Sequence, residues 1–372
     1  MNATLETCRR VYNSLLNDRN FQYDTEGKTP TRFDQQKSVL AWSKSFSEIT
    51  EVHSQVLQNV AVRVDLAYRA FFRRVKSGER PGFPRFKGDG YDSFCYPQSG
   101  FSVHQSSVYL SKIGQVKTVL HRPFVGKIKT STVRRQAGKW FVCFSAEQEP
   151  DPLPPSDLSV GVDMGLKSFA ALSDGTFVES PKFFRVDEKA LAKAGRKQAK
   201  MAKGSRERRK ANKVLSRIHE RIRNRRHNFV HQTARKIVNK FGLIAVEKLN
   251  VKGMVKNQCL AKSISDSSWS MFRAILTQKA ECAARELIAV NPSYTSQDCH
   301  QCGYRAKKKL SERWHSCPIC GSSLDRDTNA AINILKLCGA THSPGHAPVE
   351  APCFSTGSSH NSRCSKLRQA SN

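Results

Sequence analysis

Two Cys-x-x-Cys hooks constrain the fold of this chain more than any other feature. They lie at Cys299 and Cys302 and at Cys317 and Cys320, and a glycine directly follows each hook. Such a hook aims two thiolates at one point, so two neighbouring hooks can complete a tetrahedral Zn²⁺ site. A redox-active cysteine pair is the alternative, but two hooks close together favour zinc. Because four sulfur ligands leave no open position, we expect one structural Zn²⁺.

Three carboxylates far apart in the sequence each lie beside an apolar stretch. Asp163 and Glu247 end the short apolar runs 158–162 and 243–246, and Asp327 opens a helical pattern. Such residues can converge on one edge of a sheet. Carboxylate oxygens hold paired Mg²⁺ ions, which activate water and stabilise the leaving oxygen in phosphodiester hydrolysis. Taken alone, the Asp163 motif is weak and is more typical of an aspartate that caps a turn.

The net charge of the chain is +31, from 62 Lys and Arg residues against 31 Asp and Glu residues. Such a surface repels itself unless a polyanion binds, so nucleic acid is the expected partner. A membrane surface is the rival polyanion, but no apolar stretch is long enough to span a bilayer, and the N-terminus lacks the apolar region of a signal peptide. The cysteines outside the hooks show no paired spacing, which favours a reducing cytosol.

Basic residues gather in three stretches: the end of a helical pattern before residue 76, a Gly- and Pro-rich loop at 77–87 that also carries Phe, and a long segment at 185–240. Basic and aromatic side chains together suit contact with phosphates and stacking on bases. A solvated helix face is the alternative for the first stretch, and a structural loop with buried Phe is an equal alternative for the second. The third is too basic on too many faces to be only a solvated surface. The candidates for nucleic-acid contact are Arg73, Arg74, Arg85, Lys87, Arg217, Arg221 and Arg225.

The remaining pattern indicates several structural regions. Residues 1–76 show the apolar spacing of helices, and 91–148 alternate between strands and turns as in a small β-barrel or sandwich. The segment 185–240 reads as a helical hairpin, and 263–290 reads as another helix. The segment 338–372 is rich in Ser, His, Gly and Pro, which is typical of disorder.

Taken together, these motifs resemble the TnpB family, the RNA-guided DNA nucleases that insertion sequences encode and that are related to type V CRISPR effectors. The order and spacing of the matching stretches are specific, and they run from near residue 9 to near residue 337. These stretches are Gly82–Lys87, Gly161–Gly165, Arg217–His231, Val246–Glu247, Leu260–Asp266, the two hooks and Asp325–Ala331.

The resemblance implies an α/β fold: an RNase H-like RuvC nuclease domain with an inserted zinc ribbon, preceded by an N-terminal helical domain and a small β-barrel. The expected regions are a helical recognition domain at 1–79, a wedge-like β-barrel at 80–150, the first part of the nuclease domain at 151–290, the zinc ribbon at 291–323, the last acidic motif at 324–337 and a disordered tail at 338–372.

The resemblance also implies roles for single residues. Asp163, Glu247 and Asp327 match the three acidic residues that hold two Mg²⁺ ions in the family. Asp325 is the alternative candidate for the third acidic residue. The expected partners are a guide RNA from the element's own 3′ end and double-stranded target DNA beside a short transposon-adjacent motif. The expected location is the cytoplasm of a prokaryote, at the nucleoid. Whether the protein is a monomer or a dimer stays open.

One departure from the family concerns the start of the chain, where Cys8–Asn13 matches a helix that a basic β-strand usually precedes. Either the assigned start of the sequence is late or the wedge barrel lacks its first strand. A cleavage-deficient RNA-guided repressor and a transposition regulator are the alternative functions. All three carboxylates are present, which argues against the repressor. A strand-joining transposase usually has a glutamate as its third ligand, and no such pattern stands out.

Overall fold

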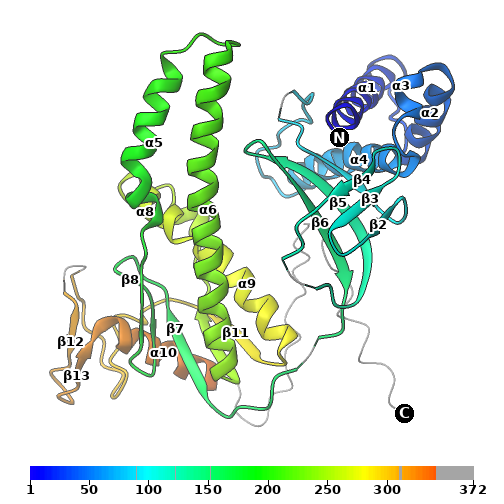
Figure 1. Ribbon diagram of the computed structural model, residues 1–372. Helices are drawn as coiled ribbons and strands as arrows, with labels where there is room; N and C mark the ends of the chain where they lie inside the picture. Colours follow the sequence, from blue (N-terminus) through cyan, green and yellow to red (C-terminus); the bar gives the residue numbers. More distant parts are fainter. Residues whose placement is uncertain (89, 122, 151, 310–311, 341–372) are drawn as a thin grey trace, which may run out of the picture. The chain divides into compact units, whose positions relative to one another are not determined.

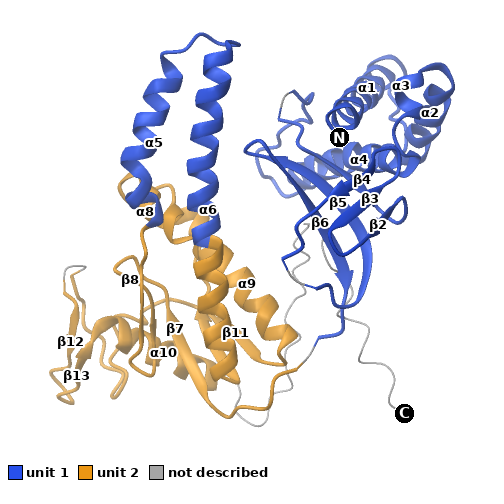
Figure 2. Ribbon diagram, viewed as in Figure 1, with its two compact units in different colours: residues 1–151, 183–226 blue, residues 152–182, 227–372 orange. Residues whose placement is uncertain are grey.

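The computed structural model describes residues 1–88, 90–121, 123–150, 152–309 and 312–340. The chain forms two compact units, each built from two stretches of sequence (Figure 2). The first unit contains Met1–Asp151 and Phe183–Arg226, and the second contains Pro152–Lys182 and the chain from His227 onward.

Helices form the N-terminal part of the first unit, as the apolar spacing predicts (Figure 1). Their apolar faces meet in one core, in which Leu15 and Val64 are fully buried. The second helix begins at a capping box, in which the Thr31 hydroxyl accepts the backbone N–H of Asp34 and the Asp34 carboxylate accepts the backbone N–H of Thr31. The helices are α1 (Asn2–Glu26), α2 (Arg32–Ser45), α3 (Ser47–Thr50) and α4 (Ser54–Lys76).

Six short strands follow, and they pair as two separate antiparallel sheets of three strands each. The strand content of this region is as the sequence predicts, whereas the closed β-barrel stays a prediction. One sheet has the order β1-β5-β6, with β1 (Ser93–Tyr96), β5 (Lys127–Gln136) and β6 (Lys139–Glu147). The other has the order β2-β3-β4, with β2 (Phe101–Val103), β3 (Ser107–Leu110) and β4 (Gly114–Lys117).

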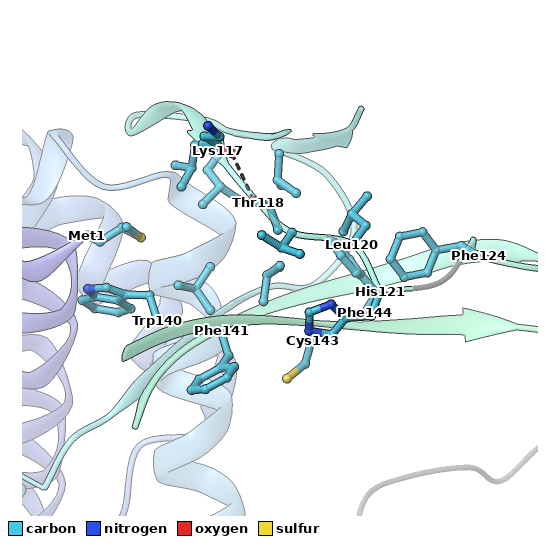
Figure 3. Close-up of a pocket in the computed structure, with 16 residues that line it drawn as sticks. Met1, Lys117, Thr118, Leu120, His121, Phe124, Trp140, Phe141, Cys143 and Phe144 are labelled. Carbon is cyan, nitrogen blue, oxygen red and sulfur yellow. Dashed lines mark hydrogen bonds between the residues drawn. The ribbon is translucent and has the colours of Figure 1, made fainter. Parts of the chain in front are cut away.

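A cavity of about 650 Å³ is lined by residues from both sheets (Figure 3). Apolar side chains make up most of its wall, including Leu110 from β3, Val133 from β5 and Phe144 from β6. Met1 and Trp140 lie at one end of the cavity, and Phe124 lies at the other. The two sheets therefore line a partly open, mainly apolar pocket.

Two long helices complete the first unit, α5 (Phe183–Ala199) and α6 (Arg206–Lys240). They form the helical hairpin that the sequence predicts, and Gly204 in the connection has a φ of 85°. Glycine adopts this left-handed backbone conformation without the steric cost that a Cβ atom imposes. The helix α6 continues beyond Arg226 into the second unit.

The second unit is built on a five-stranded mixed sheet with the order β11-β10-β7-β8-β9. Strands β7, β10 and β11 are parallel to one another, while β8 pairs with β7 and β9 in antiparallel fashion. The strands are β7 (Ser159–Asp163), β8 (Ser168–Leu172), β9 (Phe177–Glu179), β10 (Leu243–Glu247) and β11 (Glu286–Val290).

Helices cover both faces of this sheet. Alternation along β7 points Val160 and Val162 into a core shared with the end of α6 and with the helices α8 (Gln258–Ser267) and α9 (Trp269–Cys282). On the other face, Ala245 of β10 packs against Ile334 of the last helix, α10 (Arg326–Ala340). The sheet is therefore buried on both sides, which explains why its strands read as apolar runs.

The predicted single helix at 263–290 is wrong at both ends. The segment contains the end of α8, all of α9 and the edge strand β11. Ser268 has a φ of 58° between the two helices, and Ala284 has a φ of 54° after α9. Each left-handed residue ends a helix. After Ser268 the chain continues as α9, and after Ala284 it continues as β11, which runs parallel to β10.

The two hooks lie in a small module that precedes α10. It contains a two-stranded antiparallel sheet of β12 (Trp314–Ser316) and β13 (Ser323–Asp325).

The remaining described elements are short or lie at the end of the chain. A one-turn helix, α7 (Val251–Met254), precedes α8. Residues 338–340 of the predicted disordered tail belong to α10, and 341–372 lie outside the described residues. Within the described residues, no helix is long and apolar enough to cross a membrane.

Candidate functional site

Asp163 and Glu247 lie side by side at the ends of two parallel strands. In the register of β7 and β10, Val162 pairs with Val246, so the next residue of each strand is the carboxylate. Because Val162 and Val246 face the core with α6 and α9, alternation turns both carboxylates to the opposite face, toward α10. The two side chains share a hydrogen bond. The sheet thus joins two residues that lie far apart in sequence.

The third carboxylate, Asp327, comes from the first turn of α10 and lies close enough to Asp163 to act on its charge. Its Oδ1 atom is 3.6 Å from Nε of Arg326 and 3.9 Å from Nη1 of Arg313. The structure therefore places Asp163 beside Glu247, with Asp327 near enough for its charge to act on Asp163.

Asp325 has a different place in the structure. One of its carboxylate oxygens, Oδ1, accepts the backbone N–H of Asp327 at 2.8 Å, as an N-cap residue does at the start of a helix. It satisfies a backbone donor of α10, whereas Asp327 is the residue whose charge acts on Asp163. The geometry favours Asp327 over Asp325 as the third member of the cluster.

The cluster is electrostatically strained without a cation. Burial, and then the negative charges of Glu247 and Asp327, raise the pKa of Asp163 well above its ordinary value. Burial also raises the pKa of Glu247, although hydrogen bonds from Thr295 and Asp163 oppose this shift. A divalent cation would relieve the repulsion, and carboxylate oxygens are the hard ligands that Mg²⁺ prefers. The donor set therefore fits Mg²⁺.

One buried neighbour of the cluster was not anticipated from the sequence. The Thr295 side chain donates a hydrogen bond of 3.0 Å to Oε1 of Glu247, and Thr295 is only 3 % exposed. It lies four residues before the first hook. That proximity is the only sequence signal, and it does not reveal a contact with a residue 48 positions away.

The four hook cysteines converge as the spacing predicts. The sulfur atoms all lie within 4.8 Å of one another. Each hook is closed by a glycine N–H, because the amide of Gly303 donates to the carbonyl of Cys299 at 2.9 Å and a matching bond closes the second hook. The backbone N–H of Cys320 contributes most to lowering the pKa of Cys317, to about 6. Four soft thiolate donors in this arrangement fit one Zn²⁺.

The loop at Gly82–Lys87 is fixed to the helices of the first unit. Asn13 of α1 donates through its side-chain amide to the Lys87 carbonyl at 2.9 Å and accepts the Lys87 backbone N–H at 2.7 Å. The Phe83 ring packs edge-on against Phe71 of α4 at 5.3 Å between centroids. Arg74 and Arg85 come together with Arg80 around an open pocket of about 550 Å³. Lys87 and Arg73 are exposed, with the Lys87 ammonium over the ring of Tyr12.

The basic residues of α6 divide into two kinds. Arg221 and Arg225 both contact the carboxylate of Asp187 on α5, a residue that is 6 % exposed. They hold the helical hairpin together while remaining about half exposed. Arg217 is exposed one turn away. The structure therefore gives Arg221 and Arg225 a structural role beside the predicted contact with nucleic acid.

Comparison with known families gives two matches along the chain. The OrfB_IS605 family, described as "Probable transposase", matches residues 141–258. The Cas12f1-like TNB domain matches residues 269–334, which contain the four-cysteine module. The two matches cover separate and successive parts of the sequence.

Among solved structures, the chain is similar to Cas12f1 in a cryo-EM structure of its complex with sgRNA and target DNA. The TM-score is 0.56 at 16 % identity, over 89 % of this chain and 81 % of that one. This likeness shows the fold alone. The chain has a Cas12f1-like fold of mixed α/β content, with a four-cysteine cluster that is consistent with a zinc ribbon.

Two curated relatives match almost the whole chain, and both are provisionally named RNA-guided DNA endonucleases. The protein from Streptomyces pristinaespiralis is 32 % identical over 345 residues, which cover 90 % of this chain and 84 % of the relative. InsQ of Escherichia coli K12 is 32 % identical over 354 residues, which cover 88 % of this chain and 86 % of InsQ. A mimivirus TnpB-like protein is 31 % identical over 139 residues, or 36 % of this chain and 26 % of its own length. This chain therefore belongs to the TnpB family.

Proposed function

We propose that this protein is an RNA-guided DNA endonuclease of a transposable element and that Asp163, Glu247 and Asp327 form its catalytic site. The observation that carries this proposal is the meeting of the three carboxylates, from β7, β10 and α10, in one cluster. Three neighbouring acids oppose folding unless a cation joins them, which argues against a purely structural role for the cluster. The names of the relatives support the same activity.

In this proposal the three carboxylates hold two Mg²⁺ ions, which supply an activated water and stabilise the leaving oxygen when they are bound. Asp163 and Glu247 provide oxygens from the rigid sheet. Asp327 provides oxygens from α10, where Arg326 and Arg313 balance its charge. The four-cysteine module holds a structural Zn²⁺ and takes no part in the chemistry.

We assign nucleic-acid binding chiefly to the first unit. The pocket formed by Arg74, Arg80 and Arg85 and the exposed basic face of the α5–α6 hairpin suit phosphate groups. Sequence selection would come from base pairing between a guide RNA and the target strand, and the protein would read a short adjacent motif. The recognition, wedge, nuclease and ribbon regions drawn from the sequence remain proposals of this scheme.

The test is to purify the protein from cells that carry its native downstream DNA and to sequence the bound RNA. A matching DNA target is then tested for Mg²⁺-dependent cleavage, with Asp163→Ala as the control. We expect a discrete RNA from the 3′ end of the element, guide-dependent cutting, and no cutting by the variant despite normal RNA and DNA binding. Cutting by Asp163→Ala at the normal rate would refute the site. Tight guide-dependent binding without cleavage by the unmodified protein would favour the repressor alternative.

A further inference from the structure

The candidate catalytic Glu247 is linked to the four-cysteine module by a chain of hydrogen bonds that starts at a buried one and continues through partly buried ones. The first link is Thr295, whose hydroxyl lies 3.0 Å from Oε1 of Glu247 and 3.1 Å from the carbonyl of Pro292. A hydroxyl has one hydrogen to donate, so the two acceptors share it. Donation to Glu247 holds one carboxylate oxygen in a fixed direction, on a residue that is only 6 % exposed.

The second link is a pair of asparagines on α10. The Asn333 side-chain amide donates to the Thr295 carbonyl at 2.9 Å and to the Asp298 carbonyl at 2.7 Å. Asn329, which is fully buried, donates to the same Asp298 carbonyl at 2.8 Å. Because these residues are one helical turn apart, a single face of α10 holds the whole segment between Thr295 and Asp298.

The third link reaches the first hook. Asn329 accepts the backbone N–H of His300 at 2.9 Å, and the Lys336 ammonium donates to the His300 carbonyl. These bonds fix the residues on both sides of Cys299. The same helix carries Asp327 two residues before Asn329. One helix therefore carries both the third carboxylate and the side chains that hold the hook and Thr295.

We propose that Thr295 is a positioning residue for Glu247, and that Asn329 and Asn333 couple the state of the four-cysteine module to divalent-ion binding at the carboxylate cluster. The inference rests on the proposed function, because it assumes that the cluster binds the catalytic ions. When the module holds Zn²⁺, the segment at 295–300 is ordered and the hydroxyl is directed at Glu247. When the module is empty, Glu247 loses that fixed partner and the cluster binds divalent ions more weakly.

Two substitutions at Thr295 separate positioning from packing. Thr295→Val keeps the shape of the side chain and removes the hydroxyl, whereas Thr295→Ser keeps the hydroxyl and removes a methyl group. The experiment uses the full chain with its guide RNA, and Mn²⁺ serves as a probe because its free concentration can be followed by electron paramagnetic resonance. Zinc content and the thermal unfolding midpoint are measured on the same samples, so that a folding defect is recognised.

For Thr295→Val we expect the Mn²⁺ concentration at half-saturation to rise about tenfold, since a hydrogen bond to a charged group is lost. The Mg²⁺ concentration for half-maximal cleavage should rise in parallel, while the maximal rate at saturating Mg²⁺ changes less. Thr295→Ser should stay close to the unmodified protein, and both variants should keep their zinc. Unchanged binding in Thr295→Val, or binding by Thr295→Ser as weak as in Thr295→Val, would overturn the positioning role.

The coupling has its own test in Cys302→Ser, which removes a proposed zinc ligand, and in Asn333→Leu, which leaves the four cysteines intact. Both variants should weaken Mn²⁺ binding, Asn333→Leu without loss of zinc. A zinc-free Cys302→Ser protein that binds Mn²⁺ as tightly as the unmodified protein would refute the coupling. Such a result would leave the proposed function in place. The proposed function fails on a different result, namely if Asp163→Ala neither weakens Mn²⁺ binding nor stops cleavage.

Discussion

Gly161 of β7 and Ala331 of α10 are in direct contact through their backbones. A Cβ atom added to Gly161 would lie 2.0 Å from the carbonyl oxygen of Ala331, far inside the 3.0 Å that real Cβ atoms respect. The helix therefore lies as close to the sheet as backbone atoms permit. This approach carries Asp327, in the first turn of α10, to Asp163 at the end of β7. Glycine is required at position 161 to bring the carboxylates together.

The first prediction follows from this contact. Gly161→Ala should destabilise the protein by about 1–3 kcal/mol or more, because α10 must move away from the sheet to make room. The displaced helix should also weaken Mn²⁺ binding by the carboxylate cluster. The matched control is Gly195→Ala, in the middle of α5, where an added Cβ meets no atom within 4 Å. Gly195→Ala should raise the free energy of unfolding by about 0.5–1 kcal/mol. Equal effects of the two substitutions in chemical denaturation would contradict the tight packing.

The second prediction concerns pH. Burial and the neighbouring charges of Glu247 and Asp327 raise the pKa of Asp163 well above its ordinary value of 3.8. Above that ordinary value and up to the raised pKa, the folded protein holds a proton that the unfolded chain has lost. The free energy of unfolding therefore decreases as pH rises from about 4 toward the raised pKa. Without Mg²⁺, the ionised cluster should cost stability near neutral pH.

Asp163→Asn tests this directly, because it removes the charge and nearly preserves the shape. In Mg²⁺-free buffer with zinc left in place, the unfolding midpoint of this variant near neutral pH should exceed that of the unmodified protein. The expected difference is about 2–4 °C for each kcal/mol by which the free energy of unfolding increases. The difference should disappear near pH 4. Added Mg²⁺ should raise the midpoint of the unmodified protein only. The exposed Asp157 provides a control, and Asp157→Asn should behave like the unmodified protein at every pH. A destabilised Asp163→Asn protein at neutral pH would be the contrary result.

The parts of the fold that the sequence predicts well are those with a local physical signature. The hooks need only a short turn and four thiolates, so their spacing predicts a convergence that the structure contains. The strands that end at Asp163 and Glu247 are buried on both faces, and their apolar runs are therefore continuous. A parallel register then places the two carboxylates next to each other.

The parts that could not be predicted depend on exceptions to local rules or on distant partners. The turn after α9 is made by Ala284 in a left-handed conformation that glycine usually occupies, so no glycine marks the end of the helix and the strand β11 is missed. Thr295 and Glu247 meet only because the end of β10 and the segment before the first hook fold together. Arg221 resembles its basic neighbours in sequence, and only the tertiary fold pairs it with Asp187.

The third prediction is that the four cysteines bind one zinc ion per chain. Cys317→Ser should lose this zinc, because the remaining three thiolates lack the fourth ligand, and should lower the unfolding midpoint. Metal binding contributes directly to the stability of such small modules. Atomic spectroscopy of the purified protein measures the zinc content. The control is Cys282→Ser, an exposed cysteine outside the cluster, which should keep full zinc content and stability. Full zinc content in Cys317→Ser would be incompatible with a four-thiolate site.

The fourth prediction separates the two kinds of arginine on α6. Arg217→Gln should weaken binding of guide RNA and reduce the slope of log affinity against log salt by about 1, with no loss of stability, because Arg217 is exposed. Arg221→Gln should also destabilise the hairpin by about 1–3 kcal/mol, since it leaves the buried Asp187 carboxylate with weaker pairing. Filter binding at several salt concentrations and thermal unfolding measure the two effects. The control is Lys28→Gln, in the exposed connection after α1, which should change neither the RNA affinity nor the unfolding midpoint. If Arg217→Gln left the salt slope unchanged, the exposed face of α6 would not be part of the nucleic-acid interface.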